Sequence, residues 1–149
     1  IFGETDELVN KRLKGGLSFG LIMIFCVGET LEEREAELTF AVLEMQIKKG
    51  LANVTATDMA KVVIAYEPVW AIGTGKTASL DDIRDVHGYI HNSLSKILGT
   101  KTNSIKILYG GSVNNLNAAS ILVLSNVNGA LVGGASLNSK KFIDICSSI

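Results

Sequence analysis

The chain has 149 residues, of which 47% are hydrophobic and 19% are charged, and its formal net charge at pH 7 is -1. This length and composition suit a single domain with a buried core and exclude a disordered chain. The balanced charge offers no positive surface to nucleic acid or to an anionic membrane. The longest apolar run, Leu21–Val27, is far too short to span a bilayer. We therefore expect neither a nucleic-acid partner nor a membrane partner.

The N-terminus and the two cysteines bear on location and metal binding. The segment Ile1–Glu4 has neither the basic nor the apolar region of a signal peptide. It also lacks an initiator Met, which favours a sequence that begins inside a longer gene product. Cys26 and Cys146 are far apart and form no CxxC motif, so they predict no zinc site. We expect two buried, reduced thiols, no metal site and a cytoplasmic location.

Four short apolar runs rich in β-branched residues indicate strands. Residues 5–14 precede them and favour a helix that ends near Gly15 and Gly16. Because the runs are continuous rather than alternating, they predict strands buried on both faces, as in a parallel sheet. The predicted strands are Leu21–Val27, Val62–Tyr66, Ile105–Tyr109 and Ala130–Val132.

Apolar residues at helical spacing fill the segments between these strands. The first of these helices is predicted to begin at a capping box formed by Thr30 and Glu33 and to end before Gly50. Its predicted buried face is Ala36, Phe40, Leu43 and Ile47. The second is predicted to begin at the cap Ser79 and to end before Gly99. It carries Asp81 and Asp82 in its first turn, and its predicted buried face is Ile83, Val86, Ile90, Leu94 and Ile97.

Two further helices complete the predicted order. One follows Asn114 or Asn115, and its predicted buried residues are Leu116, Ala119 and Val123. The other is short and carries Phe142 and Ile145. The order is therefore one helix and then four strand–helix units, which predicts a single α/β domain over residues 1–149 with right-handed crossovers.

The loops after the four predicted strands are the expected ligand site, because ligands bind at the carboxyl ends of parallel strands. These loops are Gly28–Thr30, Glu67–Ala78, Gly110–Val113 and Gly133–Ser136. Three of them are rich in glycine, which lets backbone N–H groups approach an anion closely. One Gly-Gly pair alone is more often a tight turn. Two pairs after successive strands favour a phosphate site.

Glu67 is the candidate general base, because it directly follows a buried strand beside Pro68 and Trp70, where a carboxylate is partly desolvated. The alternative is a structural, ion-paired carboxylate, and this is the reading we favour for Glu29. The stretch Gly73–Thr77 is not a P-loop, because Trp70 stands where that motif requires Gly.

The stretch after Glu67 also fits a dinucleotide-binding pattern only loosely, because Gly73 lies too far from the strand. Small residues at 71–75, flanked by stiffer segments, instead predict a lid. His87 and His91 have the i, i+4 spacing of a metal pair but lack a third ligand. We therefore expect these two histidines to be solvated or half-buried.

Four motifs in this order resemble the C-terminal half of the triosephosphate isomerase family, and the resemblance covers essentially all 149 residues. The motifs are Cys26–Leu31, Ala65–Lys76, Tyr109–Val113 and Leu131–Leu137. The resemblance implies half of a (β/α)₈ TIM barrel, with four parallel strands alternating with helices. It also implies interconversion of dihydroxyacetone phosphate and glyceraldehyde 3-phosphate in glycolysis and gluconeogenesis. The family's enzymes need no cofactor or metal and are homodimers.

The resemblance also assigns roles to single residues. Glu67 matches the catalytic base. Four residues match positions whose backbone N–H groups hold the substrate phosphate: Gly73, Ser112, Gly133 and Gly134. Residues 68–78 match the mobile lid, and Tyr109 and Ser112 match residues that hold it closed. Glu29 matches a partner of Trp70 in the lid.

The chain departs from the family's pattern in two mild ways and one large one. Leu80 replaces a frequent Pro, and Asn128-Gly129 replaces the usual Asp-Gly. The large departure is that the family's Asn, Lys and electrophilic His, and its dimer-forming loop, belong to the first half of the barrel. We therefore expect the chain alone to be inactive.

Two alternatives stay open at this point. One is a non-catalytic phosphate-binding half-barrel from a truncated gene product, and the other is a self-sufficient flavodoxin-like phosphate binder. An open half-barrel also predicts self-association through exposed apolar residues such as Ile22, Ile24, Val63 and Ile64.

Overall fold

A parallel sheet lies at the centre of the computed structural model, which describes residues 3–74, 76–98 and 105–148. In this part of the chain the sheet has three strands in the order β1-β2-β3. They are β1 (Met23–Val27), β2 (Val62–Tyr66) and β3 (Lys106–Tyr109). The three strands alternate with helices, so the predicted α/β class and parallel sheet are confirmed.

The fourth predicted strand, Ala130–Val132, is reduced to one parallel bridge between Tyr109 and Ala130. The backbone N–H of Leu131 still donates to the carbonyl of Tyr109, at 2.9 Å. The segment lies beside β3 at the edge of the described sheet, where it pairs on one side only. Three residues that pair on one side make too few hydrogen bonds to form a regular ladder.

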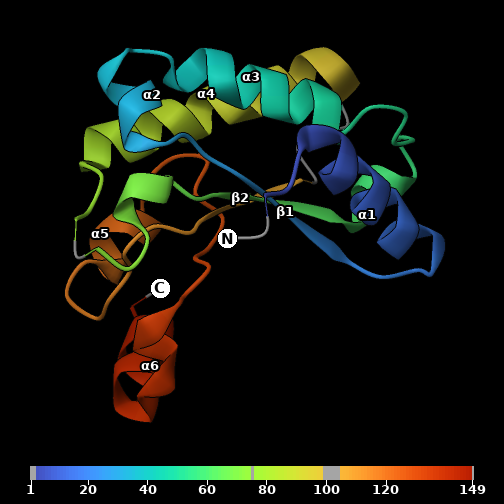
Figure 1. Cartoon of the computed structure of the whole chain (residues 1–149). Coiled ribbons are helices and arrows are strands. Elements are labelled where there is room, and N and C mark those ends of the chain that lie inside the picture. The colour runs from blue at the N-terminus through green and yellow to red at the C-terminus, as the bar shows by residue number, and fades with distance from the viewer. Residues whose placement is uncertain (1–2, 75, 99–104, 149) are drawn as a thin grey trace.

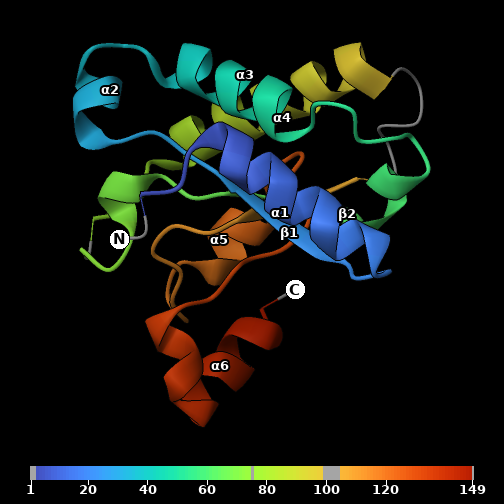
Figure 2. The same cartoon turned by 45° about the vertical axis from the view of Figure 1, so that its right-hand side comes forward.

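Successive side chains of a strand point to opposite faces of the sheet. The two faces differ in how far helices bury them. Phe25, Ile64 and Ile107 lie side by side in register and are at most 4% exposed. Helices α3 and α4 lie together over this face (Figures 1 and 2). On the β1 edge, Ile22 is 74% and Ile24 is 47% exposed.

These exposures bear on the predicted apolar surface. The prediction of exposed Ile22 and Ile24 is confirmed, and Val63 is half-buried. The prediction for Ile64 is wrong, because its place in β2 turns it toward the helices, where it is fully buried.

The helix predicted from the Thr30–Glu33 capping box is in fact two helices. The capping box is present, but it begins the short α2 (Leu31–Glu35), and α3 (Thr39–Gly50) follows separately. Between them Glu37 adopts a left-handed conformation with φ 59°. The N–H of Leu38 donates to the carbonyl of Glu33, and the N–H of Glu37 donates to that of Arg34. This is a Schellman motif, which ends a helix.

The break changes the predicted buried face. Leu43 and Ile47 are fully buried as predicted, whereas Phe40 is 44% exposed and Ala36 is also exposed. Gly50 is the last residue of α3, where the ring of Phe25 occupies the space that a Cβ would need.

Helix α1 (Asp6–Ser18) continues through the two glycines at which it was predicted to end. The longest helix, α4 (Leu80–Leu98), agrees with its prediction: Ser79 accepts a hydrogen bond from the backbone N–H of Asp82. Its predicted residues are buried except for Ile97, which is 45% exposed. The predicted end signal Gly99 lies outside the described residues.

The following helix is α5 (Ala118–Leu122), and the prediction of which of its residues are buried is wrong. Leu116 and Val123 are 87% and 80% exposed, whereas Ala118 and Ile121 are fully buried. The cause is a turn before the helix, in which the side chain of Asn114 accepts from the N–H groups of residues 116 and 117. The predicted first residues of the helix belong to this turn instead. The helix therefore starts later, and a different set of residues faces the core.

The last helix, α6 (Ser139–Cys146), extends away from the sheet in both views (Figures 1 and 2). It contains Phe142 and Ile145 as predicted; Ile145 is buried and Phe142 is 40% exposed. Cys26 and Cys146 are both exposed, so the prediction of buried thiols is wrong. Among the described residues, no helix combines the length and the apolar character needed to cross a membrane.

Candidate functional site

The carboxyl ends of the strands converge on Glu67, the first residue after β2. The backbone N–H of Glu67 donates to the carbonyl of Val27 at the end of β1, at 2.8 Å. The N–H of Gly110, directly after β3, donates to the carbonyl of Tyr66, at 2.7 Å. The hydrogen bonding therefore continues one residue past β2 and β3 and fixes Glu67 between the two neighbouring loops.

Two glycines make room for Glu67. A Cβ on Gly28 would lie 1.8 Å from the backbone oxygen of Glu67. A Cβ on Gly110 would lie 2.6 Å from Cγ of the same residue. Any side chain at either position would displace the carboxylate or its backbone. These glycines in the loops after β1 and β3 are thus required by the position of Glu67.

Glu67 is half-buried and lines a cavity of about 650 Å³. The cavity is also lined by the four residues that the resemblance matched to phosphate contacts, namely Gly73, Ser112, Gly133 and Gly134. A Cβ built on Gly73, Gly133 or Gly134 would meet no atom within 4 Å, so these backbones border open space. The structure therefore brings together all five residues that the sequence analysis proposed for the site.

Sequence reasoning missed part of the lining. Asn114, Asn138 and Lys141 also border the cavity. Lys141 lies in the first turn of α6, where the side chain of Asn138 accepts a hydrogen bond from its backbone N–H, at 3.0 Å. Asn138, a helix cap soon after the Gly133-Gly134 pair, could have indicated Lys141. A capped helix start places the side chains of its first turn beside the preceding loop.

Ser112 connects the glycine-rich loop after β3 to the loop after β2. Its hydroxyl donates to the carbonyl of Ala71, at 2.7 Å, and its own carbonyl accepts from the side chain of Asn117, at 3.0 Å. Gly73, two residues after Ala71, has φ +66°, a conformation that favours glycine. The backbone of the predicted lid is therefore hydrogen-bonded to a second loop of the cavity.

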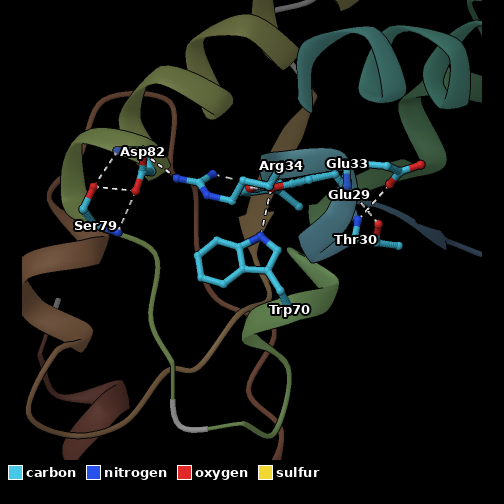
Figure 3. A network of polar contacts seen from close by, with 8 residues as sticks. Glu29, Thr30, Glu33, Arg34, Trp70, Ser79 and Asp82 are labelled. Carbon is cyan, nitrogen blue, oxygen red and sulfur yellow. Dashed lines mark hydrogen bonds and ion pairs between the residues drawn. The ribbon is translucent and has the colours of Figure 1, made fainter. Parts of the chain in front are cut away.

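Glu29 is fully buried beneath the predicted lid (Figure 3). Its carboxylate accepts a hydrogen bond from the ring N–H of Trp70, at 3.0 Å, and from the hydroxyl of Tyr66, at 3.1 Å. Burial, followed by the charge of Glu29, raises the pKa of Tyr66 and keeps its proton in place as the donor. The structure agrees with the predicted structural role of Glu29 and with its pairing to Trp70.

His87 is fully buried, so the prediction of a solvated or half-buried residue is wrong for it, whereas His91 is half-buried. The Nδ1 of His87 lies 3.0 Å from the carbonyl of Asn126 and donates to it, because a carbonyl can only accept. Burial lowers the pKa of His87 to about 4. In the described part of the chain, its Nε2 and the hydroxyl of Tyr109 have no hydrogen-bond partner.

Cys26 lies in β1, the strand next to Glu67, and the charge of Glu67 affects its thiol. Desolvation, and then the negative charge of Glu67, raise the pKa of the Cys26 thiol to about 12. The residue nevertheless has exposed surface, so a reagent can reach it. Within the described ranges, no group of three or more His, Cys, Asp or Glu side chains is placed to hold a metal ion.

Comparison with known proteins identifies the family of this arrangement. The family model of triosephosphate isomerase matches residues 1–149. The chain belongs to the triosephosphate isomerase family. It is 49% identical over 148 residues to the triosephosphate isomerase of Chloroherpeton thalassium, covering 99% of this chain and 59% of that one. It is 52% identical over 145 residues to that of Carboxydothermus hydrogenoformans, covering 97% and 58%.

A solved structure of the family gives the same result for the fold. The triosephosphate isomerase of Bartonella henselae superposes with a TM-score of 0.88 at 38% identity. The match covers 99% of this chain and 59% of that chain. The chain therefore spans about three-fifths of the length of its relatives and has the fold of half a triosephosphate isomerase barrel.

Proposed function

We propose that this chain is the part of a triosephosphate isomerase that supplies the catalytic base and the phosphate-binding loops. The whole enzyme would interconvert dihydroxyacetone phosphate and glyceraldehyde 3-phosphate in glycolysis and gluconeogenesis. The single observation that carries the proposal is the cavity that Glu67 shares with the backbone of Gly73, Ser112, Gly133 and Gly134. It combines one carboxylate with three loops, two of which have open glycine backbone.

The proposed chemistry is a proton transfer between adjacent carbons of the substrate. The carboxylate of Glu67 takes the proton from the carbon beside the carbonyl, and the electrons of that C–H bond pass to the carbonyl oxygen, giving an enediolate. The hydroxyl proton on the deprotonated carbon passes to the former carbonyl oxygen, and Glu67 returns its proton to the former carbonyl carbon, so that the carbonyl forms on the first carbon and the base is regenerated. A general base of this kind must be held close to the proton that it abstracts. The two glycines around Glu67 and the backbone bonds that flank it support such fixation.

The phosphate group would bind at the other end of the cavity. Gly133 caps a turn of 3₁₀ helix, Gly134–Leu137, that begins at Gly134, and the Cα atoms of both glycines border open space. A phosphate oxygen can therefore approach the backbone without meeting a side chain, as anion sites require. Lys141 borders the same space and adds a positive charge.

Residues 68–78 would close over the bound substrate and exclude water from Glu67. The hydrogen bond from Ser112 to Ala71 supports a link between this lid and the phosphate loop. The enediolate also needs an electrophile for its oxygen, and by resemblance the family's Asn, Lys and His lie in the part of the enzyme that this chain does not cover. We therefore propose that the chain alone has negligible isomerase activity. Self-association of the chain alone, a homodimeric whole enzyme and a cytoplasmic location stay predictions.

The proposal is tested with a joined enzyme, in which this chain follows the N-terminal part of the Chloroherpeton thalassium relative that it does not cover. We expect the chain alone to bind inorganic phosphate in calorimetry but to show no turnover in a coupled assay, and the joined enzyme to turn over. Gly134→Val should weaken phosphate binding in both, because its side chain obstructs the approach to the backbone. A joined enzyme that folds and binds phosphate but lacks activity would instead support the non-catalytic phosphate-binding half-barrel.

A further inference from the structure

Arg34 contacts residues from three separate segments of the chain (Figure 3). Its guanidinium lies 2.8 Å from the carboxylate of Asp82, in the first turn of α4. It lies 3.6 Å from the buried carboxylate of Glu29, in the loop after β1. Its carbon Cζ also lies 4.8 Å from the ring centre of Trp70, over the face of the indole. One side chain thus joins a loop, a 3₁₀ turn and a helix start.

Two of these contacts lie at the opposite ends of the proposed lid. Trp70 belongs to the turn Val69–Ala71 at the start of the lid, and Asp82 follows its end by four residues. Asp82 is also tied to the end of the lid through Ser79, because its carboxylate accepts from the hydroxyl and the backbone N–H of Ser79, at 2.6 and 3.1 Å. Arg34 therefore spans the base of the lid from one end to the other.

The helix that carries Arg34 is well anchored. The Thr30–Glu33 capping box closes its first turn, and the Schellman motif at Glu37 closes its end. Because both ends of α2 are fixed by local hydrogen bonds, the backbone at Arg34 is held in one helical conformation. A side chain on such a backbone can transmit a displacement from one of its partners to another.

We propose that Arg34 is a positioning residue that couples the two ends of the lid, so that the turn at Trp70 and the start of α4 loosen or tighten together. The contacts themselves are independent of substrate. Their meaning as a closure device rests on the proposed function, in which residues 68–78 cover the phosphate site.

The chemistry of the site requires arginine. A planar guanidinium donates from different nitrogens to two carboxylates while its face stacks on an indole, and the single ammonium of lysine does not combine these contacts. The nitrogens that face Glu29 and Asp82 are indeed different, Nη1 and Nη2. Burial opposes the charge of Arg34, but the hydrogen bond and charge of Asp82 outweigh it and raise the pKa of the guanidinium.

A simpler role for Arg34 would be to neutralise the buried Glu29. Glu29, however, already accepts from Tyr66 and from Trp70, and its distance to Arg34 is the longest of these contacts. The neutralising role involves Glu29 alone, so it does not explain the contact between Arg34 and Asp82 at the end of the lid. The two roles therefore differ in what a change at Asp82 should do to the turn at Trp70.

The test uses the full chain and needs no substrate. Trp70 is the single tryptophan, so its fluorescence reports one end of the lid without interference. The backbone N–H of Ala71 donates to the carbonyl of Pro68, and that of Asp82 donates to the hydroxyl of Ser79, so hydrogen exchange at these two amides reports both ends. The variants are Arg34→Gln, Arg34→Lys and Asp82→Asn. Asn is chosen at position 82 because it retains an oxygen that can accept from Ser79. The matched control is Asp81→Asn, a neighbour that pairs with Arg84 and is 77% exposed.

We expect Arg34→Gln and Asp82→Asn each to speed exchange at both amides by about two- to fivefold, equivalent to about 0.4–1 kcal/mol. Both should move the Trp70 emission to longer wavelength and make it easier to quench with acrylamide. Arg34→Lys should not restore the wild-type values, and Asp81→Asn should leave both amides and Trp70 unchanged.

The proposal is overturned if Asp82→Asn leaves the Ala71 amide and the Trp70 emission at their wild-type values, whatever Arg34→Gln does. Should Arg34→Gln fail to fold, Asp82→Asn alone decides the outcome. In the joined enzyme, loss of coupling should lower kcat more than it raises KM, as expected when closure is impaired. If the joined enzyme is inactive while the two amides still respond together, the proposed function fails and the coupling stands.

Discussion

Glu29 and Glu67 are two carboxylates placed after neighbouring strands of one sheet, and their surroundings differ. Glu29 is fully buried, and its oxygens accept from Trp70 and Tyr66. Glu67 is half-buried and faces a cavity bordered by open glycine backbone. A carboxylate whose oxygens accept from several donors is fixed in place, whereas one that borders open space can contact a ligand. The partners of a carboxylate, more than its place at a strand end, therefore decide what it does.

The largest expected difference between the two is catalytic. In the joined enzyme, Glu67→Gln should lower kcat by about a hundred- to ten-thousandfold, the range for loss of a general base. Its affinity for inorganic phosphate should change little, because the proposed function assigns that ion to the backbone groups of the glycine-rich loops and not to Glu67. Steady-state kinetics and phosphate inhibition measure the two effects. The control Glu32→Gln makes the same substitution at an exposed residue of α2 and should change neither.

His87 is fully buried, like Glu29, and its burial affects the free energy of unfolding. Its pKa in the fold is about 4, below the ordinary value of 6.5, so in acid the unfolded chain binds a proton that the folded chain excludes. Stability is therefore full above about pH 6.5 and falls as the pH drops toward 4, by about 3 kcal/mol in total. Urea unfolding at several pH values measures this. His87→Asn should flatten the acid loss, and the control His91→Asn should retain it.

Glu29→Gln should affect folding rather than chemistry. The amide has one acceptor oxygen where the carboxylate has two, and its NH₂ group then faces groups that act as donors to Glu29 now. We expect a loss of about 2 kcal/mol in the free energy of unfolding, typical of a buried group whose hydrogen bonds are impaired. Phosphate affinity at 25 °C should stay near wild type. If Glu29→Gln instead abolished turnover without a change in stability, the division of roles would be wrong.

The smallest expected effect is on the thiol beside Glu67. Because the charge of Glu67 contributes to the raised pKa of Cys26, Glu67→Gln should speed alkylation of Cys26 by iodoacetamide at pH 9, where reactivity follows the thiolate fraction. Mass spectrometry gives the rate at each cysteine. Exposed Cys146, at the end of α6, serves as the internal reference and should react equally in both proteins. An unchanged rate at Cys26 would mean that the two side chains do not interact.

Much of the fold could be predicted because local and tertiary preferences agree. The continuous run Val62–Tyr66 and the capped helix after Ser79 have the structure that their patterns predict. Two of the errors arose where local hydrogen bonds overrode periodicity. The Asn114 turn shifted the phase of α5, and the left-handed Glu37 divided one predicted helix into two.

The site was predictable for a different reason. Glu67 and the glycine pairs all follow strands, and parallel strands place their carboxyl ends together. Lys141 was missed because it reaches the cavity from the last helix, not from a strand end. Arg34 was missed because two of its partners, Trp70 and Asp82, are distant in the sequence, and no spacing rule connects them to it.

The central claim is that Glu67 removes a proton from a phosphorylated triose, and hydrogen exchange into the substrate tests it most directly. Dihydroxyacetone phosphate is incubated in D₂O with the joined enzyme, and proton NMR follows deuterium entering the carbon beside the carbonyl. The account predicts that the wild-type joined enzyme and Glu29→Gln both catalyse this exchange, and that Glu67→Gln slows it at least about a hundredfold. Exchange by Glu67→Gln at the wild-type rate would contradict the account and make Glu67 a structural carboxylate.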